Sequence, residues 1–168
     1  MNEFDPPIDP PIDDDEPIID PDIICMRMAL NEAQRAMDED EVPIGAVIIW
    51  NGEIIGKARN QTELLKDPTA HAEILAITQA ASVIGDWRLT NTTLYVTKEP
   101  CPMCAGAIVQ ARIPRVVWGV SDPKRGGATS RFKILDCPEL NHRPEVETGV
   151  CELESRMILQ EFFQMKRR

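Results

Sequence analysis

The order of the predicted elements indicates an α/β fold, a three-layer α/β/α sandwich with a mixed central sheet. Helical and strand patterns follow one another as helix, hairpin, helix, strand, helix, strand and helix, which is typical of a sheet covered by helices. The length of 168 residues suits one domain with one core. The composition, 43% hydrophobic and 27% charged, is that of a globular protein, so a packed core is expected.

A helix and a hairpin are expected first. Asp20 is a suitable N-cap and Pro21 a suitable first helical residue, so a helix is predicted to begin there. Two strand-like runs, 44–50 and 53–59, then flank Asn51-Gly52, which is a strong hairpin signal. The residues that give the first helix its helical period are Met26, Ala29, Leu30, Ala33, Ala36 and Met37.

The remaining elements alternate helices with strands. They are a loop at 60–67, a helix carrying His71 to about Ile84, a strand at 93–97, a helix that follows Pro100–Cys104 and ends before Pro114, a strand at 115–120, a Gly-rich loop at 121–130, a helical turn at 132–135, a strand at 145–149 and a helix at 150–168. The last helix is expected to place one set of apolar residues on a single side: Leu153, Met157, Ile158, Phe162 and Met165.

The negative charge is concentrated at the N-terminus. The chain carries a formal charge of −10, but residues 1–24 hold nine acidic and no basic residues, which leaves 19 acidic against 18 basic residues in the rest. Residues 1–22 repeat Pro, Asp and Ile and are expected to form a disordered tail, so the folded domain is predicted at 23–168. That domain is neutral enough to carry a local basic patch for a nucleic acid.

Targeting signals and disulfides are not indicated. No apolar run approaches the length of a membrane span, and the acidic, Pro-rich start does not resemble a secretory signal, so a cytoplasmic protein without a membrane partner is expected. The odd count of five cysteines argues against a disulfide framework. Cys101 and Cys104 are candidate metal ligands, and the other three are expected to be core or surface thiols: Cys25, Cys137 and Cys151.

Two short segments carry the candidate chemistry, 69–73 (TAHAE) and 100–104 (PCPMC). Alone, Cys-x-x-Cys fits zinc binding, redox chemistry or chance, and His-x-Glu is close to noise. Together, each at the start of a predicted helix, they indicate zinc, which takes thiolates and imidazoles in tetrahedral geometry. Cys101 and Cys104 are three residues apart on a first helical turn, so both sulfurs face one way and the helix N-terminus favours thiolates.

His71 and Glu73 set a condition on the position of their helix. Residues two apart inside a helix point in different directions, so both serve one site only at the very end of a helix. Asp67 or Thr69 as cap, with Pro68 nearby, supports a helix start close to His71. The sequence therefore predicts two helix N-termini that meet at one metal.

Glu73 distinguishes a catalytic from a structural zinc site. A structural site needs a fourth ligand, whereas a hydrolytic site leaves that position to water and needs a group that takes a proton from the water and protonates a leaving amine. The other histidine, His142, is expected to be a hydrogen-bonding loop residue. We therefore expect one Zn²⁺ per chain on His71, Cys101 and Cys104, with Glu73 as the catalytic acid and base.

These segments resemble the cytidine-deaminase-like superfamily, and within it the bacterial tRNA-specific adenosine deaminases. The H-x-E…P-C-x-x-C signature is known from zinc deaminases that act on flipped-out bases. The resemblance covers about residues 25–168 and is carried by VPIGAV (42–47), Asn60, DPTAHAE (67–73), TLYVTKEPCPMCAGAI (93–108), RVVWGVSDPKRG (115–126), NHRPEV (141–146) and FFQMKRR (162–168).

The resemblance implies specific roles. It implies that zinc is bound by His71, Cys101 and Cys104, and that Glu73 is the general acid/base. It implies that Asn60 hydrogen-bonds the target base, and it assigns Ala72, through its backbone, and Asp122 to holding the flipped nucleotide. It also implies a homodimer that acts on the anticodon arm of a tRNA and converts the wobble adenosine to inosine.

Two other functions remain open from the sequence. One is a deaminase of the same superfamily that acts on a free base or nucleotide, such as guanine, cytosine or deoxycytidylate. The other, from a different class, is a zinc-stabilised module that binds RNA without catalysis, against which the presence of Glu73 counts.

Overall fold

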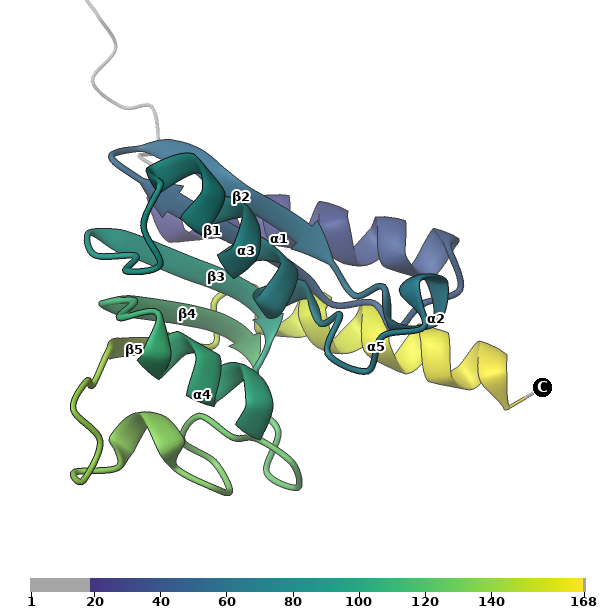
Figure 1. Cartoon of the computed structure of the whole chain (residues 1–168). Helices are drawn as coiled ribbons and strands as arrows, with labels where there is room; N and C mark the ends of the chain where they lie inside the picture. Colours follow the sequence, from purple (N-terminus) through teal and green to yellow (C-terminus); the bar gives the residue numbers. More distant parts are fainter. Residues whose placement is uncertain (1–18, 168) are drawn as a thin grey trace, which may run out of the picture.

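The computed structural model describes residues 19–167 (Figure 1). Most of the expected acidic tail, residues 1–18, and the final Arg168 therefore lie outside the described residues. No helix of the described part is both long and apolar enough to cross a bilayer.

A five-stranded mixed sheet forms the middle layer, in the order β2-β1-β3-β4-β5. β1 pairs antiparallel with β2 and with β3, whereas β4 and β5 join in parallel. The strands are β1 Gly45–Trp50, β2 Glu53–Arg59, β3 Thr92–Lys98, β4 Arg115–Val120 and β5 Glu145–Thr148. The predicted mixed sheet and its hairpin are confirmed.

Helices cover both faces of the sheet, which confirms the predicted sandwich (Figure 1). One face carries α1 and α5, and the other carries α3 and α4. The helices are α1 Pro21–Asp38, α2 Thr62–Leu65, α3 Ala72–Ile84, α4 Pro102–Gln110 and α5 Glu152–Lys166, with a 3₁₀ turn, η1, at Ile134–Asp136. The short α2 was not predicted, because four residues are too few to show a helical period.

α1 begins as its capping residues predict. Asp20 is the N-cap and accepts a hydrogen bond from the Asp22 N–H at 2.9 Å, and Pro21 occupies the first position. Asp22, which the predicted domain boundary leaves in the tail, lies in the first turn of this helix. Its carboxylate accepts from both terminal nitrogens of Arg115 on β4, at 2.9 and 2.7 Å, and from the Tyr95 hydroxyl on β3 at 2.7 Å.

The predicted apolar side of α5 is wrong in part. Phe162 is buried, but Leu153, Met157 and Met165 are exposed at 66, 57 and 50%. The helix instead packs on the sheet through Ser155, which is fully buried over Gly119 of β4. A Cβ atom at position 119 would lie 2.3 Å from the Ser155 Oγ, so close packing here admits only small residues, and the turn of α5 that meets the sheet is not its most apolar one.

Candidate metal and catalytic site

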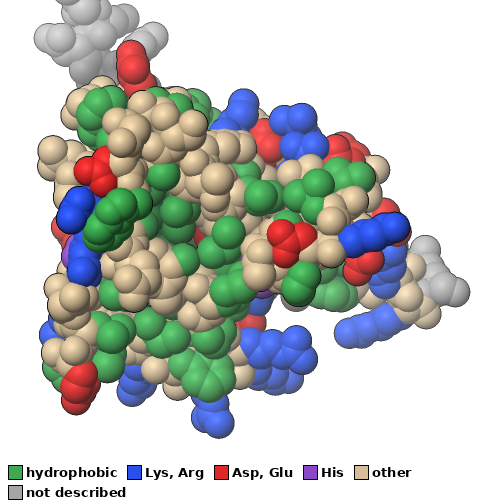
Figure 2. Space-filling view, viewed as in Figure 1, with side chains coloured by type: hydrophobic (Ala, Val, Ile, Leu, Met, Phe, Trp, Pro, Cys, Tyr) green, Lys and Arg blue, Asp and Glu red, His purple; other side chains and the backbone are tan. Residues whose placement is uncertain are grey.

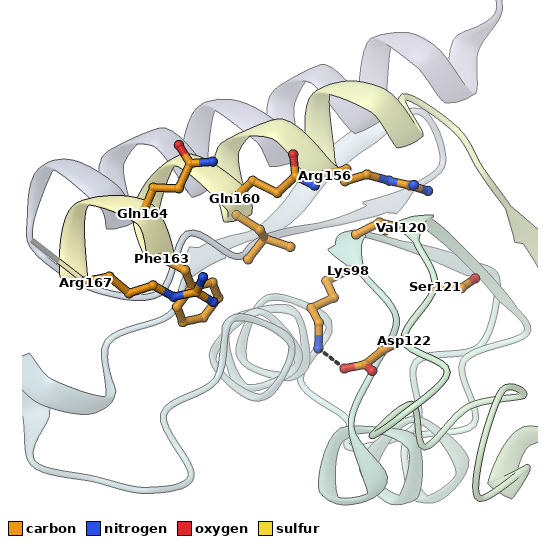
Figure 3. A pocket seen from close by; sticks show the side chains of 10 residues that line it. Lys98, Val120, Ser121, Asp122, Arg156, Gln160, Phe163, Gln164 and Arg167 are labelled. Atoms are coloured by element: carbon orange, nitrogen blue, oxygen red, sulfur yellow. Dashed lines mark hydrogen bonds and ion pairs between the residues drawn. The ribbon is translucent and has the colours of Figure 1, made fainter.

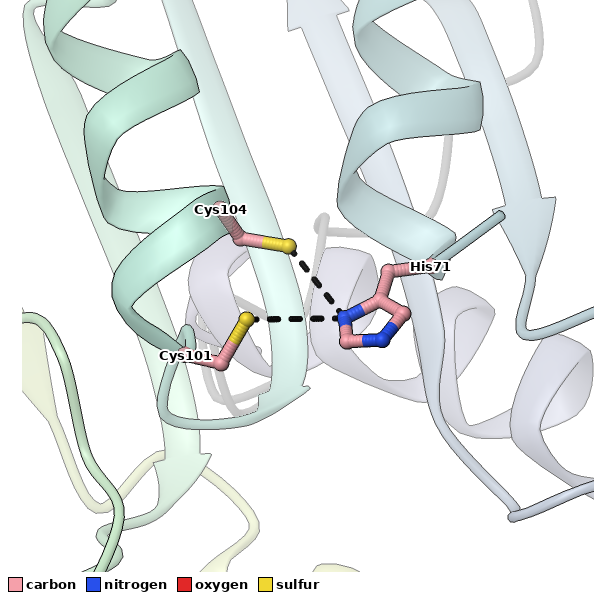
Figure 4. Close-up of side chains that lie close together, drawn as sticks. All are labelled: His71, Cys101 and Cys104. Carbon is pink, nitrogen blue, oxygen red and sulfur yellow. Dashed lines mark hydrogen bonds between the residues drawn. The ribbon is translucent and has the colours of Figure 1, made fainter. Parts of the chain in front are cut away.

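Two helix N-termini meet and bring together the three candidate ligands, His71, Cys101 and Cys104, called the ligand group below (Figure 4). His71 is the N-cap of α3 and Cys101 the N-cap of α4, both with extended backbone, and Cys104 lies in the first turn of α4. The Nδ1 of His71 lies 3.5 Å from the Sγ of Cys101 and 3.5 Å from the Sγ of Cys104.

These distances fit a tetrahedral zinc ion. Zn–S bonds of about 2.3 Å and Zn–N bonds of about 2.0–2.1 Å at a tetrahedral angle place sulfur and nitrogen about 3.5 Å apart. In residues 19–167, no fourth His, Cys, Asp or Glu side chain joins the three ligand atoms, which lie within 4.8 Å of one another. These three groups could therefore hold a zinc ion and leave its fourth position to water, which is the arrangement of catalytic zinc sites.

α3 begins close to His71, as predicted, but its N-cap is His71 itself and not Asp67 or Thr69. This start lets His71 and Glu73 face the same space. His71 precedes α3 and Glu73 is its second residue, so the two side chains are not held two apart inside a regular helix. Glu73 is 4% exposed, and burial raises the pKa of its carboxyl group. A buried carboxyl beside the ligand group is placed to hold and release a proton.

The thiols polarise one another. A hydrogen bond from Cys104, together with one from His71, lowers the pKa of Cys101 to about 4. The hydrogen bond with Cys101, with burial, raises the pKa of Cys104. The hydrogen bond to Cys101 also raises the pKa of His71. The two thiols and His71 are therefore electrostatically coupled, and a metal ion bound here would take both thiols as thiolates.

A cleft of about 660 Å³ opens in front of His71. Its charged lining is mainly basic, since Lys98, Lys124, Arg125 and Arg167 face a single acidic residue, Asp122. The other lining residues are Val42, Ile44, Asn60, Thr62, Leu159 and Phe163. Such a cleft attracts an anionic substrate.

A second hollow of about 570 Å³ continues the cleft along α5 (Figure 3). Figure 3 shows Phe163 of α5 and Arg167, which follows α5, across this space from Lys98 and Asp122, which belong to both hollows. In Figure 2, Lys and Arg side chains lie on both sides of a hollow near the C-terminal end of α5.

The three candidate substrate residues have different surroundings. Asn60 follows β2, is 5% exposed and lines the cleft, where its side chain contacts Glu41 and Thr62. Ala72 is fully buried, which leaves only its backbone to act. Asp122 lines the cleft with both oxygens engaged, because one pairs with the Lys98 ammonium at 2.5 Å and the other caps the turn that follows.

Glu99, which the sequence analysis did not single out, holds the loop at 121–130. Its buried carboxylate accepts from the Asp122, Thr129 and Ser130 N–H groups at 2.8–3.0 Å and from the Ser130 hydroxyl at 2.5 Å. These bonds outweigh burial and lower the pKa of Glu99. Gly127 lies so close to the start of α4 that a Cβ there would be 2.3 Å from the Pro102 nitrogen. No local feature of the sequence separates this residue from a surface acid, because its donors lie 23 to 31 positions further along the chain.

His142 is a loop residue, as predicted. Its Nε2 lies 2.7 Å from the Ile113 carbonyl oxygen, to which it donates, and it is not part of the ligand group.

Comparison with known proteins points to one family. A family model described as MafB19-like deaminase matches residues 21–167. The chain is 46% identical to the tRNA-specific adenosine deaminase of Bacillus subtilis over 88% of this chain and 91% of that protein. It is 47% identical to the tRNA-specific adenosine deaminase of Agrobacterium fabrum over 84% of this chain and 93% of that protein.

Solved structures give the same result. One, from work on A-to-I editing by tRNA:A34 deaminases at the wobble position of transfer RNA, superposes with a TM-score of 0.79 at 46% identity, over 81% of this chain and 99% of that chain. A guanine deaminase from Nitrosomonas europaea superposes with a TM-score of 0.73 at 20% identity, over 85% of this chain and 84% of that chain, and shares the fold alone.

Proposed function

The chain belongs to the MafB19-like deaminases and, among them, to the family of tRNA-specific adenosine deaminases, and on this premise we propose that it hydrolyses adenosine to inosine at the wobble position of tRNA anticodons. The observation that carries the proposal is the group of His71, Cys101 and Cys104 at two helix N-termini, with the buried carboxyl of Glu73 beside it. A protein that modifies tRNA would act in the cytoplasm, which is the location we propose.

Zinc is the metal that fits the three ligands. His71, through Nδ1, and the two thiolates of Cys101 and Cys104 would hold one Zn²⁺ per chain. A zinc ion there would supply a Lewis acid that lowers the pKa of a water in the fourth position to about 7. Cys and His ligands favour zinc over harder cations, and hydrolysis needs no redox step.

Glu73 moves the protons of the reaction. Its carboxylate takes a proton from the attacking water and delivers it to N1 of the purine while the water oxygen adds to C6. The carboxylate then takes the second proton, from the hydroxyl now on C6, and passes it to the amino nitrogen, so that the C6–N bond breaks, ammonia leaves and a C6 carbonyl remains. The burial of Glu73 keeps bulk water away from this proton.

The walls of the cleft suit a nucleotide within an RNA. Asn60, the backbone of Ala72 and Asp122 are the residues we propose to hold the target nucleotide. The basic residues of the lining would attract phosphates of the anticodon arm. Phe163, 45% exposed at the rim, would offer a stacking surface to an unpaired base.

We propose in addition that two copies of the chain associate through α3 and α4. A largely apolar groove of about 480 Å³ lies there, lined by Ile77, Trp87, Ala107, Gln110 and Ala111. A Cβ atom at Gly106 would meet no other atom, so this side of α4 is uncovered in the single chain. Small residues here allow close packing of a second copy next to the metal site. Sedimentation should give a dimer at micromolar concentration, and a monomer would contradict the proposal.

The test of function is inosine formation. The protein should convert adenosine to inosine in a tRNA that carries adenosine at the wobble position, and should leave free guanine and cytosine unchanged. Glu73→Ala should retain zinc and fold but lose about 10²–10⁴ in rate, the usual contribution of a general acid/base. Turnover of a free base alone would favour the free-base reading, and RNA binding with no inosine would favour a non-catalytic module.

A further inference from the structure

A buried carboxylate outside the catalytic group lies behind the cleft. Glu41, in the connection from α1 to β1, is 1% exposed, and the ion pairs of the described residues do not include it. Its oxygens accept from the Leu64 N–H at 2.7 Å, from Asn60 Nδ2 at 3.1 Å and from the Thr62 hydroxyl at 3.3 Å. A buried carboxylate is costly unless donors surround it, and three donors face this one.

These contacts determine the orientation of the Asn60 carboxamide. A carboxylate only accepts hydrogen bonds, so the carboxamide atom of Asn60 that faces Glu41 is the nitrogen and not the oxygen. Nδ2 also lies 3.3 Å from the Thr62 hydroxyl oxygen, so both of its N–H groups have an acceptor. The backbone is held as well, since the Asn60 N–H donates to the Ile44 carbonyl at 3.0 Å. Within the described residues, the carboxamide oxygen has no hydrogen-bond partner.

We propose that Glu41 is a positioning residue that makes Asn60 a hydrogen-bond acceptor for the substrate. With both N–H groups of Asn60 taken up by Glu41 and Thr62, Oδ1 is the polar atom left for a ligand in the cleft. Asn60 then selects a donor group of the bound nucleotide, such as an amino or hydroxyl group. This inference rests on the proposed function for the identity of the ligand, but the Glu41–Asn60 contact does not.

A purely structural role is the competing explanation, because Glu41 also holds the first turn of α2 through the Leu64 N–H. The two explanations differ in whether the effect of losing Glu41 depends on the presence of the Asn60 side chain. If Glu41 acts through Asn60, its removal has little effect once the Asn60 side chain is gone. If it acts through general stability, the two losses add.

A double-mutant cycle in kcat/KM for inosine formation separates them. Glu41→Gln places an NH₂ group against a donor and should lower kcat/KM about 10- to 100-fold. In an Asn60→Ala background the same change should cost less than about twofold. Glu32→Gln is the matched control, since Glu32 is equally buried but pairs with Arg35 and Arg59 away from the cleft, and it should leave kcat/KM unchanged. Additive losses, or an equal loss in the control, would overturn the proposal.

A second readout does not depend on tRNA. In the wild-type protein, the side-chain NH₂ signal of Asn60 in an ¹⁵N–¹H spectrum, assigned by its loss in Asn60→Ala, should exchange slowly with water. Glu41→Gln, or Thr62→Val if that variant does not fold, should speed this exchange at unchanged zinc content. Fast exchange in the wild-type protein would refute the inference about Glu41 and Asn60. Absence of inosine from wild-type protein with slow exchange would refute the proposed function instead.

Discussion

The ligand group and the wall of the cleft are built in different ways. The ligand group needs two short segments, with His71 at the start of α3 and Cys101 and Cys104 at the start of α4. The wall of the cleft needs side chains from separate parts of the chain: Asn60 after β2, Lys98 at the end of β3, Asp122 after β4, Phe163 on α5 and Arg167 after α5.

The two regions also differ in how far they depend on supporting residues. In the ligand group, three ligand atoms lie within 4.8 Å of one another and need no further residue to complete the set. In the wall, Glu41 contacts Asn60 and Glu99 holds the loop of Asp122, so these two wall residues each depend on a second residue behind them. Loss of a ligand should therefore abolish function, whereas loss of a supporting residue should reduce it by degrees.

The largest effect is expected from removal of a ligand. Cys104→Ala should reduce bound zinc from about one ion per chain to almost none, abolish inosine formation and lower the melting temperature, because metal binding is coupled to folding. Metal analysis and thermal unfolding measure this. Cys137→Ala is the matched control, since Cys137 lies outside the ligand group and should keep zinc and activity. A Cys104→Ala protein that is active without metal would show that the ligand group is not essential for function.

An intermediate effect is expected when Glu99, which supports the wall of the cleft, is replaced. Glu99→Gln keeps one acceptor oxygen and turns an NH₂ group toward two of the donors that Glu99 now satisfies. The expected cost is about 1–3 kcal/mol in the free energy of unfolding, with a lower kcat/KM and normal zinc content. Urea unfolding, kinetics and metal analysis measure the three quantities. If Glu99→Gln lost zinc together with activity, the wall and the ligand group would be one unit.

The smallest effect is expected far from both regions, at the Asp22–Arg115 pair that joins α1 to β4. The hydrogen bonds from Arg115 lower the pKa of Asp22 in the folded protein. A carboxyl group whose pKa is lower in the folded than in the unfolded protein contributes its full stabilisation above the unfolded pKa of about 3.9. This contribution disappears as the pH falls through the pKa of the folded protein. Asp22→Asn should therefore cost about 1 kcal/mol at pH 7.

Urea unfolding from pH 7 to pH 3 checks the sign of this effect. The difference between wild type and Asp22→Asn should be constant above about pH 5 and shrink below about pH 4. Glu145→Gln is the control, because Glu145 is the exposed partner of Arg115 at 3.6 Å and should contribute little. Neither variant should change kcat/KM. If the difference in free energy of unfolding grew toward low pH, Asp22 would not stabilise the fold as an ionised carboxylate.

Local signals in the sequence predict where most elements begin and which residues are candidate metal ligands. Asp20-Pro21 marked the start of α1, Asn51-Gly52 marked the hairpin, and the two short motifs marked the starts of α3 and α4. These signals are local, because capping, turn conformation and the facing of side chains three apart depend on neighbours within a few residues.

The residues behind and across the cleft are set by contacts between distant segments, which local signals do not predict. Glu41 and Glu99 have no local signal that separates them from surface acids, since their donors come from residues 19 to 31 positions away along the chain. The buried side of α5 was decided in the same way, by the small residues Ser155 and Gly119 that let helix and strand approach, and not by the most apolar stripe of the helix. Burial and hydrogen bonding between distant segments depend on how the sheet orders its strands, and that order is a property of the whole chain.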